Sequence, residues 1–214
     1  MEPEAINTFQ YFNSNHNVTD IYSKSGCDLL NRVNNMFKNY TPKTVIDITC
    51  IETDLGMMIA AATGKGICML EFADCKLLEL ELRQLAAFSK APLVRGENIY
   101  FDILREQIYE YFRGERKNFD IPVYMIGTEF QKQVWLSLLK IPYGCTTSYK
   151  KQAELLGMPS AVRAVANANG KNKISVILPC HRVIGTDGAL TGYGGGIWRK
   201  KKLLELEKDN TPAK

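Results

Sequence analysis

A thiol and an imidazole stand side by side at Cys180 and His181, directly after Pro179 and an apolar run. A cysteine that only fills a core needs no basic neighbour, whereas a reacting cysteine does, because the thiolate is the nucleophile. The chain has two histidines, and the other, His16, lies in a polar, asparagine-rich segment. Chemistry that pairs a thiol with an imidazole therefore depends on Cys180 and His181.

The cysteines as a set indicate a reducing compartment. All six stand outside any C-x-x-C pair or dense framework, which favours reduced thiols in a cytoplasmic protein and no metal site. The first residues show no basic leader with an apolar core, so we expect no secretory signal. No apolar run approaches the roughly 20 residues of a membrane helix, so we expect no membrane partner.

Charge divides the chain into two unlike parts behind a formal net charge of +4. Residues 1–127 carry 13 basic and 17 acidic side chains, whereas residues 128–208 carry 13 and 5. The balance therefore changes from −4 to +8. A basic half is typical of a protein that faces a polyanion such as nucleic acid. Charge alone fits a lysine-rich soluble surface as well.

The N-terminal unit, residues 44–121, has the pattern of a small antiparallel sheet with helices. Its three apolar runs, TVIDITCIE, MMIAAA and ICMLEF, are separated by the turn-like TDLG and TGKG, which predicts three consecutive strands. Asp74 is expected to cap a helix over residues 76–88, and a second helix is expected over residues 99–112. This unit offers no catalytic cluster.

The C-terminal unit, residues 122–208, is expected to be mostly helical. Thr128 and Gln131 form a capping box before an apolar helical face. Ser148 is expected to cap a second helix, YKKQAELL, and Ser160 to open a third, AVRAVANAN. Two short helices joined by a glycine-containing turn are typical of a helix-turn-helix, although the same pair is common as plain packing.

The third helix of this unit carries a polar face, and the segment after it leads to the cysteine. Arg163 and Asn167 lie one turn apart, opposite the apolar residues, in the basic part of the chain. An exposed arginine on a recognition helix favours DNA binding. The next apolar run, SVIL at residues 175–178, is expected to be a short buried strand that Pro179 ends, so that Cys180 lies where the chain turns away.

The two ends of the chain predict less. Residues 1–43 are polar, with eight asparagines, and we expect a polar tail or a short helix near residues 29–37 of unknown role. A final helix is expected over residues 197–208, followed by a C-terminal tail at residues 209–214.

The ordered motifs of residues 123–208 together resemble a known family. They are GTEFQKQVWLSLLKIPYGCTTSY, RAV, an asparagine seven positions before PCHRVIG, LTGYGGG and KKLLELE. In this order and spacing they resemble the methylated-DNA–protein-cysteine methyltransferases, also called O6-alkylguanine-DNA alkyltransferases. Residues 44–121 resemble that family's ribonuclease-H-like domain more loosely. The implied fold is α+β: a small N-terminal antiparallel sheet with helices, then a mostly helical domain with a helix-turn-helix and the active-site cysteine.

The resemblance implies a single-turnover enzyme that repairs DNA by direct reversal and needs no cofactor. Cys180 would accept the alkyl group of O6-alkylguanine, and of O4-alkylthymine, irreversibly. His181 would remove the thiol proton through a bound water, and Glu207 would orient the imidazole. Asn172 would brace the turn between the recognition helix and the cysteine.

The resemblance also implies a DNA surface. The partner would be double-stranded DNA that contains alkylated guanine, bound by a monomer through the minor groove. Arg163 would enter the duplex and fill the gap left by the extruded nucleotide, whereas Tyr149 would crowd the 3′ phosphate and donate a hydrogen bond to the departing base. The other predicted DNA contacts are Ser148, Asn167 and Lys171.

A pocket for the flipped base would adjoin the cysteine. Tyr193 and Gly194 would line it, with the N–H of Gly194 near the alkylated oxygen. The carbonyls of Cys180 and Val183 would accept from the guanine amine. The variable upper rim would include Asn169 and Ser175.

Three other readings remain open from the sequence. A cysteine hydrolase would need an oxyanion hole and would leave the helix-turn-helix unexplained. A non-catalytic lesion sensor would lack the acceptor cysteine, which is present here. A methylation-activated transcription regulator could coexist with repair, and the polar segment at residues 1–43 is the only feature that favours it.

Overall fold

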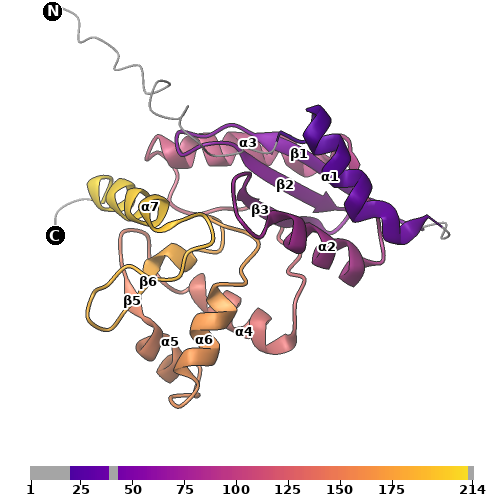
Figure 1. Cartoon of the computed structure of the whole chain (residues 1–214). Coiled ribbons are helices and arrows are strands. Elements are labelled where there is room, and N and C mark those ends of the chain that lie inside the picture. The colour runs from indigo at the N-terminus through magenta and orange to yellow at the C-terminus, as the bar shows by residue number, and fades with distance from the viewer. Residues whose placement is uncertain (1–19, 39–42, 212–214) are drawn as a thin grey trace, which may run out of the picture.

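The structure, a computed structural model, describes residues 20–38 and 43–211 (Figure 1). His16 and most of the predicted polar tail lie outside these residues. A helix in the N-terminal segment is confirmed, but α1, Lys24–Asn34, begins earlier than expected and ends in a 3₁₀ turn. It begins there because the side chain of Ser23 accepts from the backbone of Gly26.

The predicted sheet is present with one additional strand. Its order is β3 (Gly66–Phe72), β2 (Met58–Thr63), β1 (Ile46–Ile51) and β4 (Leu93–Arg95). The first three strands pair antiparallel, as their apolar runs and turns predict, whereas β4 pairs parallel with β1. The sequence gives no signal for β4, because it has three residues and two of them are exposed.

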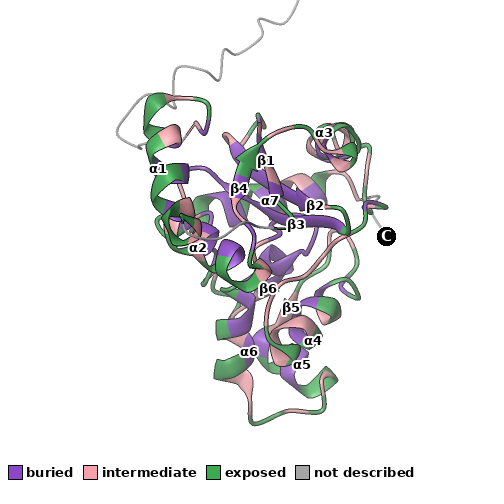
Figure 2. Cartoon of the chain, turned by 90° about the vertical axis from the view of Figure 1, so that its right-hand side faces the viewer, coloured by how far each residue is buried: buried purple, intermediate pink, exposed green. Residues whose placement is uncertain are grey.

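Strands β2 and β3 are buried on both faces, as their purple ribbons in Figure 2 show. Alternate residues of β2 belong to two different apolar clusters, as the period of two in a strand requires. One cluster joins the sheet to α1 and to α2, Leu78–Ser89. The other joins it to α3, Ile99–Phe112, and to the C-terminal unit, including Cys180. The sheet therefore packs directly against the predicted active-site turn.

The capping role predicted for Asp74 is wrong. Helix α2 begins after Leu77, and no side chain caps it. The carboxylate of Asp74 instead pairs with both terminal nitrogens of Arg199, at 2.7 and 2.9 Å. Arg199 is buried and lies 125 residues away in the sequence. Leaving a buried guanidinium without a carboxylate costs more free energy than leaving a helix end without a capping side chain, so Asp74 pairs with Arg199.

The C-terminal unit contains four helices: α4 (Glu129–Leu138), α5 (Tyr149–Leu155), α6 (Val162–Asn169) and α7 (Ile197–Asp209). The capping box at the start of α4 and the cap of α5 by Ser148 are confirmed. Helices α4, α5 and α6 pack together at one end of the molecule (Figure 1).

The role predicted for Ser160 is wrong. Helix α6 follows Ala161 and has no side-chain cap. The backbone N–H of Ala161 donates to Met158, so a tight turn of the main chain leads into the helix. Such a turn can start a helix without a capping hydroxyl.

The strand predicted for SVIL is wrong, although its burial is confirmed. Residues 175–178 form a turn in which Val176 has φ +73° and Ile177 N donates to Ser175 O. Just before it, Leu70 N donates to Lys173 O, and Ser175 N donates to Leu70 O. Two backbone hydrogen bonds thus join the edge of β3 to the first residues of the turn. Leu70 and Ile174 form a single β-bridge there instead of a paired strand.

Candidate active site

Cys180 begins a single 3₁₀ turn, Cys180–Arg182, whose three side chains are buried. The amide of Asn172 donates to the carbonyl of Leu178 at 2.8 Å and lies 3.3 Å from the sulfur of Cys180. Its oxygen accepts from the backbone of Ile174. Asn172 therefore ties the segment after α6 to the cysteine, as the sequence predicts.

His181 and Glu207 form a buried pair. The Nε2 atom of His181 lies 2.8 Å from Oε1 of Glu207, and both side chains are fully inaccessible to solvent. A carboxylate accepts there, so Nε2 carries the proton and Nδ1 is left as an acceptor. Nδ1 is buried and has no hydrogen-bond partner among the described residues. Nδ1 of His181 is therefore available to accept a proton.

Glu207 has three further partners that the sequence interpretation missed. Arg182 donates to both its carboxylate oxygens, Tyr111 donates through its hydroxyl at 2.7 Å, and Gly144 donates through its backbone at 3.0 Å. Burial opposes ionisation, but the hydrogen bonds from His181 and Arg182 and the charge of Arg182 prevail and lower the pKa of Glu207 to about 2. The carboxylate is therefore ionised at neutral pH.

Ionisation of the cysteine and the histidine is suppressed by burial. Burial raises the pKa of Cys180 to about 11, the hydrogen bond from Asn172 and the charge of Lys200 lower it, and the charge of Glu71 raises it. Burial also lowers the pKa of His181, against the effect of Glu207. The resting site consequently holds a thiol beside a neutral imidazole.

Lys200 is a buried cation that the sequence interpretation missed. Its ammonium donates to the carbonyls of Val183 and Thr191, each at 2.6 Å, and lies 3.5 Å from the hydroxyl of Tyr149. Burial lowers its pKa to about 8, and Cys180 raises it. Lys200, Leu203 and Glu207 share the buried face of α7, so helical spacing in the run RKKK was the signal that could have found it.

Tyr149 and Tyr193 lie near the turn that carries Cys180. The hydroxyl of Tyr149 donates to Thr191 O at 2.9 Å, and the negative charge that Cys180 can carry adds to burial in raising its pKa. The ring of Tyr193 meets His181 edge to face at 6.5 Å between centroids. Tyr193, predicted to line the pocket, and Tyr149, predicted to contact the 3′ phosphate and the base, are thus both brought near the turn that carries Cys180.

The predicted pocket residues Ser175 and Gly194 meet a side chain from the N-terminal unit. Ser175 is buried and its hydroxyl donates to Oε2 of Glu71 at 2.9 Å. A Cβ placed on the exposed Gly194 would lie 3.5 Å from the same oxygen. No motif marked Glu71, because the contact arises from pairing between β3 and residues 173–175. Val183 is buried, and its carbonyl accepts from Lys200.

Asn169 is the predicted pocket residue that the structure places elsewhere. Its amide donates to Gln152 at 2.6 Å. Gln152 in turn donates to Ser137 and to the backbone of Val134. Asn169 thus belongs to a buried amide network that joins α6 to α4 and α5.

The predicted DNA contacts lie at the surface of the helix-turn-helix. Arg163, Asn167 and Lys171 are exposed on α6 and just after it. Ser148 is half-buried, and its hydroxyl accepts from Lys151 N at the start of α5. Inside, α6 packs against α4 and α5 through Val165. The exposed side chains are free to meet a large partner.

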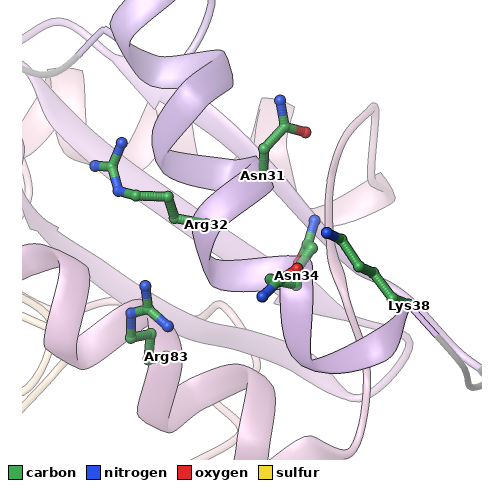
Figure 3. Close-up of a pocket in the computed structure, with 6 residues that line it drawn as sticks. Asn31, Arg32, Asn34, Lys38 and Arg83 are labelled. Atoms are coloured by element: carbon green, nitrogen blue, oxygen red, sulfur yellow. The ribbon is translucent and has the colours of Figure 1, made fainter.

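A hollow of about 530 Å³ lies apart from this site, between α1 and α2 (Figure 3). Its residues serve the fold: Arg32 and Arg83 share the carboxylate of Glu79, and Asn34 exchanges two hydrogen bonds with the backbone of Leu93. Helix α1 thereby covers the edge of β4. Within the described ranges, no group of three His, Cys, Asp or Glu side chains could hold a metal ion.

Two domain models match most of the chain. The model described as "6-O-methylguanine DNA methyltransferase, ribonuclease-like domain" matches residues 46–125, and "6-O-methylguanine DNA methyltransferase, DNA binding domain" matches residues 129–209. A methylated-DNA–protein-cysteine methyltransferase of Mycobacterium leprae is 54% identical over 164 residues, 77% of this chain and 93% of that relative. The chain belongs to the methylated-DNA–protein-cysteine methyltransferase family. The family resemblance predicted from the motifs is confirmed.

Two other members of the family match this chain over segments of different length. The methyltransferase of Methanosarcina barkeri is 41% identical over 160 residues, 75% of this chain and 96% of the relative. That of Mycobacterium bovis is 56% identical over 108 residues, half of this chain and 66% of the relative's own length.

Solved structures of the family share this fold. The crystal structure of Mycobacterium tuberculosis OGT in complex with DNA is 41% identical and superposes with a TM-score of 0.66, over 78% of this chain and 96% of that one. An O6-methylguanine-DNA methyltransferase from Pyrococcus kodakaraensis, at 23% identity, shows the fold alone with a TM-score of 0.61. The predicted α+β fold, with a small sheet followed by a mostly helical part, is confirmed.

Proposed function

We propose that this protein repairs alkylated DNA by moving the alkyl group of O6-alkylguanine, and of O4-alkylthymine, to Cys180. The observation that carries the proposal is one turn that holds a buried thiol next to Asn172, followed directly by the buried His181–Glu207 pair. A nucleophile, a neutral base and an ionised orienting group are thereby held together.

Activation begins with the thiol proton. Nδ1 of His181 is the bare acceptor, and a water molecule between Sγ and Nδ1 passes the proton to the imidazole. Glu207 stabilises the imidazolium that forms, because it is already ionised. The ammonium of Lys200 and the amide of Asn172 both favour the thiolate of Cys180.

The transfer step balances without a cofactor. The thiolate sulfur attacks the alkyl carbon, a carbon–sulfur bond forms, and the carbon–O6 bond breaks with its electron pair going to the base. The base takes up one proton to become guanine, which balances the proton that Cys180 lost. Water does not readily cleave the thioether, so each chain acts once.

The base must leave the duplex before it can react. An alkyl carbon on O6 lies inside the stack, and Cys180 is buried, so the nucleotide is flipped at a cost of a few kcal/mol. Arg163 enters the duplex from the exposed face of α6, with Asn167, Lys171 and Ser148 beside it on the backbone. These contacts offset the cost of flipping.

The pocket residues then hold the flipped base. The hydroxyl of Tyr149, next to the Lys200 ammonium, gives up its hydrogen bond to Thr191 O and donates to the base instead, and the N–H of Gly194 faces O6. The carbonyls of Cys180 and Val183 accept from the guanine amine. Each carbonyl already accepts once within the protein, and a carbonyl oxygen can accept a second hydrogen bond. Tyr193 closes the side toward His181.

One chain carries every group that this mechanism uses, so a monomer suffices. No helix in the described part of the chain is long and apolar enough to cross a membrane. We place the protein in the cytoplasm, in contact with the DNA on which it acts.

Intact-protein mass spectrometry tests the proposal. After incubation with a duplex that carries one O6-methylguanine, the wild type gains the mass of one methyl group per chain. Cys180→Ser gains none, whereas Cys145→Ser, which removes an exposed cysteine, gains the methyl group as the wild type does. An unchanged wild-type mass with the duplex still bound would leave a lesion sensor or a regulator. Repeated turnover on an ester would indicate a hydrolase.

A further inference from the structure

Glu71 is a buried acid that the repair mechanism above does not use. It lies on β3, the edge strand that pairs with residues 173–175, and its side chain is 1% exposed. Its oxygens accept from the backbone of Phe72 at 2.8 Å and from the hydroxyl of Ser175 at 2.9 Å. The N-terminal unit therefore contributes one carboxyl group to the pocket side of the active-site turn.

The carboxyl of Glu71 is neutral at neutral pH. Burial and the negative charge of Glu81 raise its pKa to about 8, whereas Arg199 has the opposite effect. The other titratable groups in its field are Cys180, Tyr193 and Cys75. A neutral carboxyl has one O–H donor, and both hydrogen bonds above use Glu71 as an acceptor. The donor is available to a ligand.

A second donor without a partner lies in the same place. The hydroxyl of Tyr193 is buried, and no hydrogen-bond partner for it occurs in the described ranges. Burial raises the pKa of this hydroxyl, the charges that Cys180 and Glu71 can carry raise it further, and the nearby hydroxyl of Ser175 lowers it. Buried donors are rarely left unpaired, because each one costs free energy until it finds an acceptor. This side of the turn thus presents two donors, with the Ser175 hydroxyl bonded to Glu71 and close to Tyr193.

We propose, on the basis of the function proposed above, that Glu71 and Tyr193 form a polar wall that selects alkyl groups bearing a hydroxyl. The carboxyl of Glu71 lies against Ser175 and beneath Gly194, the predicted neighbour of O6. A 2-hydroxyethyl group on O6 places an oxygen two carbons beyond the alkylated oxygen, where it accepts from this wall. A propyl group has the same number of heavy atoms and offers no acceptor.

The site discriminates between the hydroxyethyl and propyl groups because only the hydroxyethyl oxygen pairs with the buried donors of Glu71 and Tyr193. A site built to hydrogen-bond a hydroxyl rejects an analogue without it more strongly than an apolar pocket rejects an added hydroxyl. We expect the wild type to accept the 2-hydroxyethyl group at least about tenfold faster than the propyl group, since one satisfied hydrogen bond is worth about that factor.

Single-turnover rates on three duplexes test this inference. They carry O6-methyl-, O6-(2-hydroxyethyl)- or O6-propylguanine, and the readout is the hydroxyethyl-to-propyl rate ratio in full-length protein. Glu71→Leu lowers the ratio at least fivefold, whereas Glu71→Gln, which keeps a donor and an acceptor, stays within about twofold of the wild type. Comparing ratios between variants cancels the intrinsic reactivity of the two alkyl groups.

The matched control is Gln107→Leu, another buried polar side chain of the N-terminal unit. Gln107 lies on α3, where it accepts from Asp120 N, and it is not among the groups that act on Glu71, so this variant leaves the ratio unchanged. If Glu71→Leu does not fold, Ser175→Ala, which removes the hydroxyl bonded to Glu71, lowers the ratio instead.

Two results would overturn the inference without touching the repair function. One is a ratio in folded Glu71→Leu that equals the wild-type ratio. The other is a wild type that accepts methyl but neither larger group. Failure of the wild type to accept even methyl would instead refute the proposed function.

Discussion

Each unit contributes one buried carboxyl group to the active-site turn, and the two differ in charge: Glu71 acts on Cys180, and Glu207 pairs with His181. Glu207 and Glu71 are equally inaccessible, at 0% and 1% exposed. Glu207 accepts from Arg182, His181, Tyr111 and a backbone N–H, and its pKa falls to about 2. Glu71 accepts from one hydroxyl and one N–H, forms no ion pair among the residues described, and its pKa rises to about 8.

The comparison shows that partners, and not burial, decide the charge of a buried acid here. Burial raises the pKa of both groups, but only Glu207 has a guanidinium and an imidazole at hydrogen-bond distance. An ionised Glu207 supports the base next to Cys180. A neutral Glu71 avoids adding a second negative charge near the thiolate.

The largest expected effect comes from removing the charge of Glu207. In Glu207→Gln, Arg182 becomes a buried cation without its carboxylate, which we expect to lower the free energy of unfolding by about 3–5 kcal/mol. The imidazolium also loses its stabilising charge, so methyl transfer slows by about a hundredfold or more. Urea unfolding and single-turnover rates measure the two effects.

A control on the same helix sharpens this prediction. Glu205→Gln removes an exposed carboxylate that pairs only with surface lysines, and it changes the free energy of unfolding by about 1 kcal/mol or less. Equal effects of the two variants would contradict a special role for Glu207.

Lys200→Met tests the cation that favours the thiolate. Methionine keeps a similar length without the charge, so the pKa of Cys180 rises further and methyl transfer at pH 7 slows about tenfold. The midpoint of a pH profile of iodoacetamide alkylation reports the thiol pKa. Lys201→Met removes a neighbouring exposed ammonium and leaves the midpoint in place. An unmoved midpoint in Lys200→Met would show that the cation acts only on the carbonyls.

Glu71→Gln is expected to have the smallest effect on transfer and an opposite effect on stability. The folded pKa of Glu71, about 8, lies above its ordinary value of 4.5. The folded state therefore holds more protons between these values, and wild-type stability falls as pH rises from 4.5 to 8. Glutamine removes this loss. The variant's advantage, a few kcal/mol at most, grows across this window and is constant above it.

Unfolding titrations at pH 5, 7 and 9 measure that advantage. A constant difference between the two proteins over this range would mean that Glu71 is ionised throughout, as Glu207 is.

The motifs could bring the residues of the C-terminal site together because they are close in sequence or on one helix face. His181 pairs with Glu207, and Asn172 contacts the sulfur of Cys180. Glu71 escaped prediction because it reaches Ser175 across 104 residues through the pairing of a strand edge with a turn. Apolar content alone also could not separate a buried strand from the buried turn at residues 175–178.

The basic run before Leu203 gave no signal that two of its side chains are buried. Arg199 and Lys200 are buried, whereas the next two lysines are exposed, although all four share the run RKKK. A basic run is normally read as a solvated face, and only its register against Leu203 distinguishes the two pairs. The three-residue strand β4 had no apolar alternation to reveal it.

The most direct test of the opposite charges of Glu71 and Glu207 is a carbon-13 NMR titration of the glutamate side-chain carboxyls. The account predicts one resonance, absent in Glu71→Gln, that titrates near pH 8, and another, assigned to Glu207, that shows no change from pH 9 down to pH 4. If the Glu71 resonance titrated below pH 5, the acid would be ionised beside Cys180 at neutral pH. The claim that partners set opposite charges on these two equally buried groups would then be wrong.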